Sequence, residues 1–122
     1  SDVTIIANGQ MVYRSIMAAK ELEGKVSVGV LNMHTVKPID ATAVVNAARE
    51  TGAIVTAEEH QVIGGLGSAV AEVLSCHHPI PLEIVGVLDT FGESGQPNEL
   101  MEHYHLGVSD IVHAVERAIK RK

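Results

Sequence analysis

The sequence predicts an α/β domain whose parallel sheet is covered by helices on both faces. Short apolar runs rich in Val and Ile alternate four times with stretches in which apolar residues recur at helical spacing. Near-continuous apolar strands are typical of a parallel sheet buried on both sides. Because 122 residues are enough for one domain and too few for two ordinary ones, we treat residues 1–122 as a single domain.

The same patterns place the individual elements. Strands are predicted at Val3–Ala7, Val26–Leu31, Ala53 to Ala57 or Glu58, and Leu82–Leu88. Helices are predicted at Gln10–Glu23, from the N-cap Asp40 to Glu50, at Gly67–Cys76, at Asn98–His103 (a short one), and from the N-cap Ser109 into the basic tail. In the first helix the stripe expected to face the core is Val12, Ile16, Met17 and Leu22.

Composition restricts the function and the compartment. A net charge of −6 and only three aromatic residues argue against binding to nucleic acid. The single cysteine, Cys76, rules out an internal disulfide; we interpret it as a partly buried residue at a helix end. Neither a membrane-spanning stretch nor a signal peptide is recognisable, so a cytoplasmic protein without membrane contact is expected. The chain also lacks an initiator Met and enters a strand by Val3, as a domain cut from a larger chain would.

A glycine-rich loop follows the third predicted strand. Gly64, Gly65 and Gly67 allow close backbone approach, and Gly67-Ser68 opens a helix whose free N–H groups could bind an anion. The spacing, however, matches neither the dinucleotide-binding glycine pattern nor the phosphate loop ending in G-K-[ST]. We therefore favour tight packing of strand against helix, with Ser68 near the cap, and keep anion contact as the alternative.

Three ionisable residues, Glu58, Glu59 and His60, stand at the end of that strand. A carboxylate beside an imidazole could serve acid–base chemistry. Successive strand residues point to opposite faces, so Glu58 and His60 would share a side while Glu59 points away. A carboxylate that ties the loop together, or a subunit contact, is the favoured interpretation.

A second polar loop, 89–97, follows the fourth predicted strand. Its candidates for an interface or an anion contact are Asp89, Phe91, Ser94 and Gly95. Phe91 between polar residues suits docking to a partner and suits filling the base of the loop equally well. The seven histidines show no zinc-site spacing, so no metal ligands are assigned. From these residues alone no reaction can be named.

Four ordered motifs resemble one known family. They are Val3–Gly9, Met33–Asp40, Glu58–Val70 with its glycines, and Gly86–Gly95 followed by Glu99-Leu100, Tyr104 and Leu106. Together they cover essentially the whole chain, which resembles the C-terminal domain of transketolase and is most similar to the C-terminal subunit of split transketolases. Similar domains end deoxyxylulose-phosphate synthase and the β subunits of 2-oxoacid dehydrogenases.

The resemblance implies a three-layer α/β/α sandwich with a mainly parallel sheet of four or five strands. The strands present here would have the order 2-1-3-4, and the family's extra antiparallel strand ahead of Val3 would be missing or truncated. Transketolases transfer a two-carbon ketol unit between sugar phosphates with thiamine diphosphate and Mg²⁺, which other domains hold at the dimer interface. Neither the G-D-G motif that binds the diphosphate and metal nor the domain with the activating Glu is present, so no catalytic or cofactor-binding residue is assigned to this chain.

The resemblance leaves three interpretations open. The first is a non-catalytic domain that supports a homodimer and packs against the remaining transketolase domains or subunit. The second is an independent anion-binding module that uses the Gly64–Ser68 helix start and the loop at Ser94 and Gly95. The third is the C-terminal domain of a 2-oxoacid dehydrogenase β subunit, docking to a lipoyl-carrying core, or of deoxyxylulose-phosphate synthase. Glu59-His60 and the loop at Phe91–Gly95 favour the first.

Overall fold

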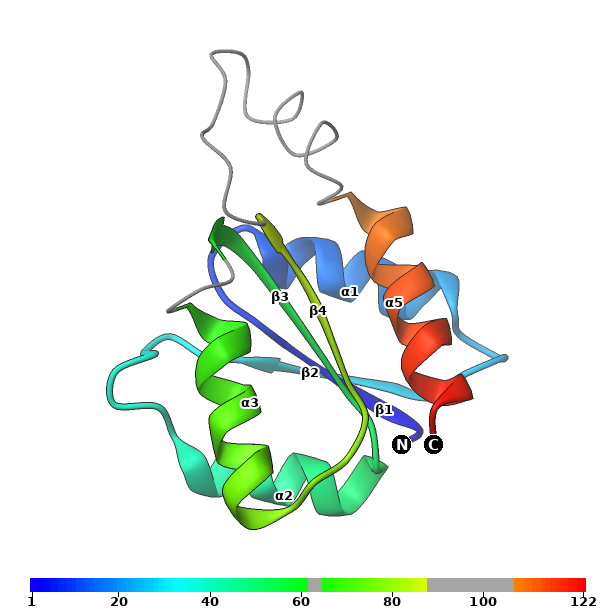
Figure 1. The fold of residues 1–122 in the computed structure, drawn as a ribbon. Coiled ribbons are helices and arrows are strands. Elements are labelled where there is room, and N and C mark those ends of the chain that lie inside the picture. The colour runs from blue at the N-terminus through cyan, green and yellow to red at the C-terminus, as the bar shows by residue number, and fades with distance from the viewer. Residues whose placement is uncertain (62–64, 88–106) are drawn as a thin grey trace.

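The computed structural model describes residues 1–61, 65–87 and 107–122, in which strands and helices alternate (Figure 1). The strands are β1 (Val3–Ala7), β2 (Val28–Asn32), β3 (Ile54–Gln61) and β4 (Leu82–Val87). The helices in these residues are α1 (Met11–Glu21), α2 (Ala41–Thr51), α3 (Leu66–His77) and α5 (Val108–Lys120). The helix predicted at Asn98–His103 and the strand end predicted at Leu88 lie outside the described residues.

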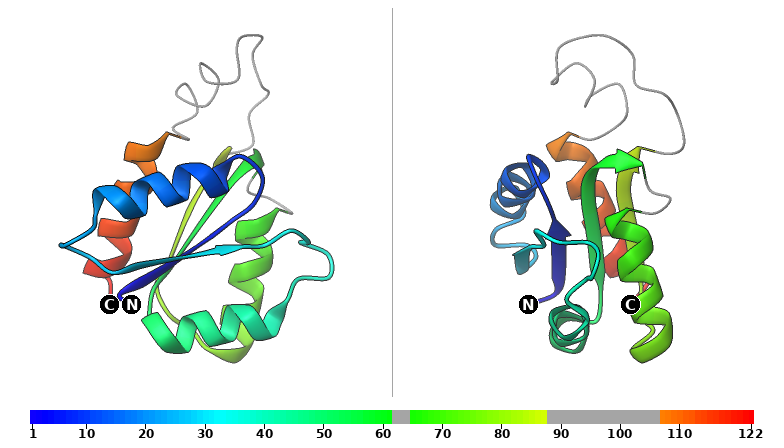
Figure 2. Two further views of the ribbon diagram at one scale, coloured as in Figure 1. Left: turned by 180° about the vertical axis from the view of Figure 1, so that it is seen from behind. Right: turned by 90° about the vertical axis from the view of Figure 1, so that its left-hand side faces the viewer.

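The sheet is parallel throughout, and its strand order β2-β1-β3-β4 confirms the prediction. Figure 2 shows the sheet between two helical layers, so the predicted three-layer sandwich is also confirmed. Helices α1 and α5 pack on one face and share one apolar core, while α2 and α3 pack on the other face around a second core. Because all strands run the same way, their carboxyl ends meet at one edge, where α1, α3 and α5 begin.

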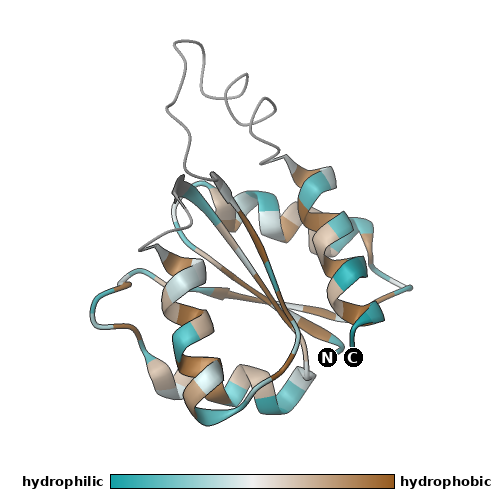
Figure 3. Cartoon of the chain, in the orientation of Figure 1, coloured by the Kyte–Doolittle hydropathy of each residue, from teal (hydrophilic) through white to brown (hydrophobic). Residues whose placement is uncertain are grey.

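Alternating strand residues supply the two cores. In β1, Val3 and Ile5 belong to the core under α1 and α5, whereas Ile6 belongs to the core under α2 and α3. The strands carry the most continuous apolar colouring in Figure 3, as expected for a sheet covered on both faces. No helix in the described ranges is long and apolar enough to span a membrane.

Three helices turn the apolar residues of their predicted stripes to the core. The buried ones on α2, α3 and α5 are Val44, Ala48, Val70, Val73, Leu74, Ile111 and Val115. The other predicted ones, Ala41, Val45, Val112 and Ile119, are partly buried against the same cores. Asp40 caps α2 as expected, because its Oδ1 accepts a hydrogen bond from the Ala43 amide at 3.0 Å. Cys76 is exposed near the end of α3, so the prediction that it is partly buried was wrong.

Some element boundaries also differ from the prediction. Strand β2 begins at Val28 instead of Val26, because the Val26 amide still bonds to the Leu22 carbonyl at 2.9 Å and closes the turn after α1. Helix α5 begins at Val108 with Gly107 as its N-cap, and Ser109 is an exposed residue in its first turn. The Gly107 amide donates to Asp110 Oδ2 at 3.0 Å, so Asp110 holds the start of the helix, and the prediction of Ser109 as the cap was wrong.

Helix α1 faces the core with a different stripe from the one predicted. Ile16 and Met17 are 41% and 36% exposed, while Ser15 and Ala18 are fully buried. The helix packs against the sheet and against α5, and small residues allow close approach there. Burying Ser15 costs little because its hydroxyl donates to the Met11 carbonyl at 2.7 Å. The prediction was right for Leu22, which is buried, and for Val12, which packs against the core, but wrong for Ile16 and Met17.

Candidate functional site

The polar groups of the sheet's carboxyl edge gather where β3 ends. From Ala57, which pairs with Val85, to Gln61, which pairs with Val87, β3 advances by four residues and β4 by two. The two extra residues make a bulge that contains Glu58, Glu59 and His60. Bulges redirect side chains and are frequent next to functional sites. This one turns two neighbouring carboxylates toward different helices.

Glu58 holds the start of α3. Its side chain is 1% exposed, and its Oε2 and Oε1 accept hydrogen bonds from the amides of Leu66 at 2.7 Å and Gly67 at 3.2 Å. The first amides of a helix have no partner within the helix, and the helix dipole makes that end positive. Gly65, the N-cap, has no side chain to satisfy them. Glu58, a residue of β3, therefore caps the N-terminus of α3 in place of an N-cap side chain.

Glu59 performs a similar task for α1 on the other side of the sheet. Its Oε1 accepts a hydrogen bond from the amide of Gln10, the N-cap of α1, at 2.9 Å. Gly9 adopts φ +58°, and a Cβ at that position would lie 3.0 Å from the same Oε1. A glycine therefore fits the turn on two grounds, its left-handed backbone and the closeness of the carboxylate. Neither Gln10 nor Gly9 was predicted to belong to the site. The sequence feature that could have indicated them is the Asn8-Gly9 turn, which follows the neighbouring strand β1.

Gly67 allows α3 to lie directly on the sheet. A Cβ at Gly67 would come within 2.8 Å of Ile84 Cγ2 and 3.1 Å of Thr56 Oγ1. Real Cβ contacts are not that short, so a side chain here would push the helix away. The Thr56 hydroxyl below it is buried and has no hydrogen-bond partner within the described residues. These contacts support the packing interpretation of this part of the glycine loop.

The anion-binding alternative meets an obstacle at the same place. The Leu66 and Gly67 amides, which an anion would need, already bond to the Glu58 carboxylate. A phosphate approaching them would meet a buried negative charge. Ser68 is half-buried in the first turn of α3. The geometry makes an independent phosphate site at this helix start unfavourable.

Several predicted candidates lie outside what the structure describes. Gly64, Asp89, Phe91, Ser94 and Gly95 belong to the ranges 62–64 and 88–106, and the side chain of His60 is likewise not described. Their proposed contact roles stay predictions. Of the remaining candidates, the structure brings together Glu58, Gly65, Gly67 and Ser68 at one helix start and places Glu59 at another.

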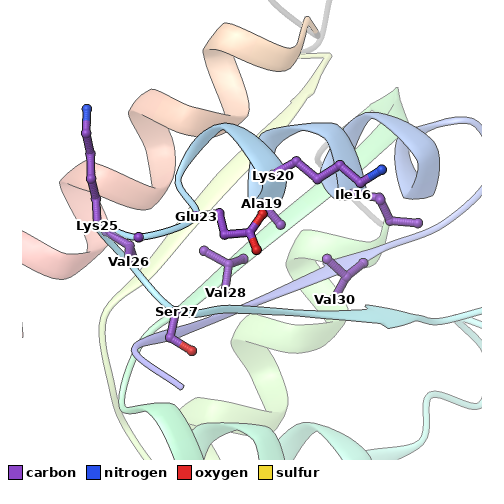
Figure 4. A pocket seen from close by; sticks show the side chains of 10 residues that line it. Ile16, Ala19, Lys20, Glu23, Lys25, Val26, Ser27, Val28 and Val30 are labelled. Carbon is purple, nitrogen blue, oxygen red and sulfur yellow. The ribbon is translucent and has the colours of Figure 1, made fainter.

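Two grooves line the surface of the described residues, and one of them reaches the start of α3. One, of about 580 Å³, runs between α1 and the edge strand β2, and Figure 4 shows Ile16, Val28 and Val30 at it. The other, of about 460 Å³, lies between the segment Val36–Ile39 and α3, with Cys76 in its lining. Within the described part of the chain, no three His, Cys, Asp or Glu side chains cluster closely enough to hold a metal ion.

In the described part of the chain, a parallel β2-β1-β3-β4 sheet carries two helices on each face. The starts of α1 and α3 are held by carboxylates from a bulge in β3, so the fold is a doubly covered α/β domain. The chain belongs to the family described as "Transketolase, C-terminal domain", whose profile matches residues 1–111.

The relatives are parts of transketolase-type enzymes. The chain is 51% identical to the 6-deoxy-6-sulfo-D-fructose transketolase subunit SqwH of Clostridium sp. (strain MSTE9), covering 99% of this chain and 38% of that protein. It is 39% identical to one subunit of the apulose-4-phosphate transketolase of Phocaeicola vulgatus, over 99% of this chain and 39% of the relative. The chain thus spans about two fifths of these relatives.

A solved structure confirms the fold. A split-gene transketolase described as an inactive β4 tetramer superposes with a TM-score of 0.94 at 54% identity, over 99% of this chain and 40% of that one. The chain is therefore a transketolase C-terminal domain, and subunits of transketolase-type enzymes are among its relatives.

Proposed function

We propose that this domain is a non-catalytic part of a thiamine-diphosphate-dependent two-carbon transferase, which it supports by holding the dimer and bracing the cofactor domains. The observation that carries the proposal is the use of Glu58 and Glu59. These carboxylates, the best acid–base candidates of the sequence, accept hydrogen bonds from three backbone amides at two helix starts. A carboxylate held in this way is committed to the backbone, because turning it toward a substrate would leave helix amides without a partner.

The cofactor does not fit the described residues. A diphosphate–Mg²⁺ pair needs oxygen ligands for the metal and free donors for the phosphates. The described residues contain no cluster of three potential metal ligands, and the α3 start is closed by Glu58. We therefore derive no reaction step on this chain. The cofactor would bind to other domains, as the resemblance implies.

The partners in this proposal are the other domains or subunit of a split enzyme and a second copy of the same chain. Support comes from the two curated relatives, which are named as subunits, and from the solved relative, which is described as a β4 tetramer. The substrates would be a ketose phosphate donor and an aldose acceptor, in the cytoplasm. A deoxyxylulose-phosphate synthase is the second candidate, favoured by 38% identity over 124 residues to the enzyme of Desulforudis audaxviator.

A domain exchange tests this proposal. The C-terminal domain of the split transketolase that is 54% identical would be replaced by residues 1–122 of this chain, or deleted. We expect the exchanged enzyme to assemble and turn over, the deleted one to lose assembly, and the isolated chain with thiamine diphosphate and Mg²⁺ to make no product. Turnover by the isolated chain, or full assembly and activity of the deleted enzyme, would overturn the proposal.

A further inference from the structure

Helix α1 presents large apolar side chains to solvent. Tyr13, Ile16 and Met17 are 69%, 41% and 36% exposed and are the exposed large hydrophobic residues of the described chain. Their spacing makes them neighbours on one helix face, opposite the face that Met11, Ser15 and Ala18 turn to the core. Single exposed apolar residues are ordinary, but three adjacent ones in a domain with few aromatics indicate a contact surface.

The apolar surface continues from the helix onto the sheet. Ile16 also lines the groove between α1 and β2, where Val28 and Val30 form the opposite wall (Figure 4). Lys20 and Glu23 also line that groove. Protein–protein contacts commonly combine apolar and charged side chains in this way.

The exposed stripe is complementary to itself. Lys20 extends it by one turn, so that Tyr13 and Lys20 lie at equal distances from the centre of the stripe, which falls between Ile16 and Met17. If two copies of α1 pack antiparallel about a two-fold axis, the Tyr13 ring of each meets Lys20 of the other. Ile16 then meets Met17. A two-fold contact requires this reciprocity, and a lysine over a tyrosine ring is a favourable pair.

The charges of the helix ends match the same arrangement. The first turn of α1 carries no acidic residue of its own, although the helix dipole makes it positive. Antiparallel packing brings the partner's Glu21 and Glu23, both on the exposed surface, to that first turn. These carboxylates would add to that of Glu59, which already accepts a hydrogen bond from the Gln10 amide at the same helix start.

We propose that the stripe Tyr13, Ile16, Met17 and Lys20 on α1 is the surface through which two copies of this domain associate. The proposal rests on the proposed self-assembly of the enzyme and names its contact. Of the interface candidates of the sequence, Glu58 and Glu59 accept hydrogen bonds from amides of their own domain.

Sedimentation and light scattering of the 122-residue chain over a concentration series test the proposal. Ile16→Glu places a charge at the centre of the stripe and should raise the dimer dissociation constant at least about tenfold, as loss of a central contact does. Lys20→Glu should raise it by a smaller factor. Ser75→Glu, on the exposed surface of α3, is the matched control and should change nothing. Circular dichroism establishes that each variant is folded.

Crosslinking then locates the contact. In a Cys76→Ser background, Met17→Cys lies next to the proposed axis and should form a disulfide-linked dimer under mild oxidation, whereas Ser75→Cys should not. If the chain forms a dimer whose dissociation constant Ile16→Glu does not change, two copies associate through another surface, and the proposed stripe on α1 is refuted. A chain that stays monomeric at every concentration would refute self-association of the domain. If, in that case, Ile16→Glu weakened assembly of the exchanged enzyme, the occupant would be another domain.

Discussion

Two neighbouring carboxylates hold two helix starts in different ways. Glu58 is buried and satisfies two amides of α3, whereas Glu59 is half-buried and satisfies one amide of α1. An unsatisfied amide costs most where water cannot replace the lost partner. Two adjacent residues of the same type should therefore differ several-fold in their contribution to stability, and burial, more than residue type, should decide the difference.

The largest expected effect is that of Glu58→Ala. It leaves two amides without partners in a buried place and should lower the free energy of unfolding by about 3–5 kcal/mol. Glu59→Ala removes one half-exposed partner and should cost about 1 kcal/mol, like the loss of an ordinary cap. Urea denaturation of both variants measures the difference.

A conservative substitution sharpens this comparison. Glu58→Gln keeps one oxygen acceptor but presents an NH₂ group to the second amide, so its loss should lie between those of the two alanine variants. Equal losses for Glu58→Ala and Glu59→Ala would contradict the account, because burial would then have no influence on the value of the cap.

The next effect concerns the closeness of α3 to the sheet. Gly67→Ala would bring a methyl group to 2.8 Å from Ile84 Cγ2 and should destabilise the domain by about 2 kcal/mol, as overpacking does. Gly29→Ala is the matched control, because its nearest neighbour is 4.0 Å away and its backbone needs no glycine. Thermal denaturation of both variants measures the difference in stability. Similar melting temperatures would show that α3 can move away from the sheet without destabilising the domain.

Thr56 lies under the same helix and should give an effect of opposite sign. Its buried hydroxyl lacks a partner among the described residues, and valine has nearly the same shape. Thr56→Val should therefore stabilise the domain by about 1 kcal/mol, because a buried polar group without a hydrogen bond is removed. A loss of stability on urea denaturation would reveal that the hydroxyl does have a partner.

The smallest effect belongs to Glu83 on β4. Partial burial raises the pKa of this carboxyl, but hydrogen bonds from Arg117 at 2.8 Å and Arg121 at 2.5 Å outweigh it, so the pKa lies below the ordinary 4.5. Its stabilisation is therefore present above pH 4.5 and is lost as the pH falls through the lowered pKa. Both arginines are about half exposed, so Glu83→Gln should cost less than about 1 kcal/mol at pH 7. The stability difference from wild type should vanish in acid; a difference that persists there would show a role unrelated to charge.

Sequence patterns predicted the strands better than the helix faces. The four apolar runs gave the sheet because a strand buried on both sides needs no choice of face. In helix α1 the large apolar residues Ile16 and Met17 were expected in the core, whereas the polar Ser15 is buried in their place. Only the three-dimensional structure shows that the serine hydroxyl bonds to its own helix and that Ala18 belongs to the core shared with α5.

The site was predictable in its position but not in its contacts. Strand alternation indicated that Glu58 and Glu59 point apart, and the structure directs them to helices in different layers. The bulge after Ala57 and the partners of each carboxylate depend on the register with β4 and on helix packing. These contacts join residues that are not neighbours in the sequence, so no local sequence pattern predicts them.

The turnover of an assembled enzyme that carries Glu59→Gln in this domain tests the central claim most directly. The glutamine side-chain oxygen can still accept a hydrogen bond from the Gln10 amide, but glutamine cannot transfer a proton as a carboxyl group does. The account predicts a kcat per assembled, folded enzyme within about twofold of wild type, whereas loss of a general acid or base costs about 10²–10⁴. A hundredfold fall in kcat with fold and assembly intact would contradict the claim that this carboxylate supports the structure alone.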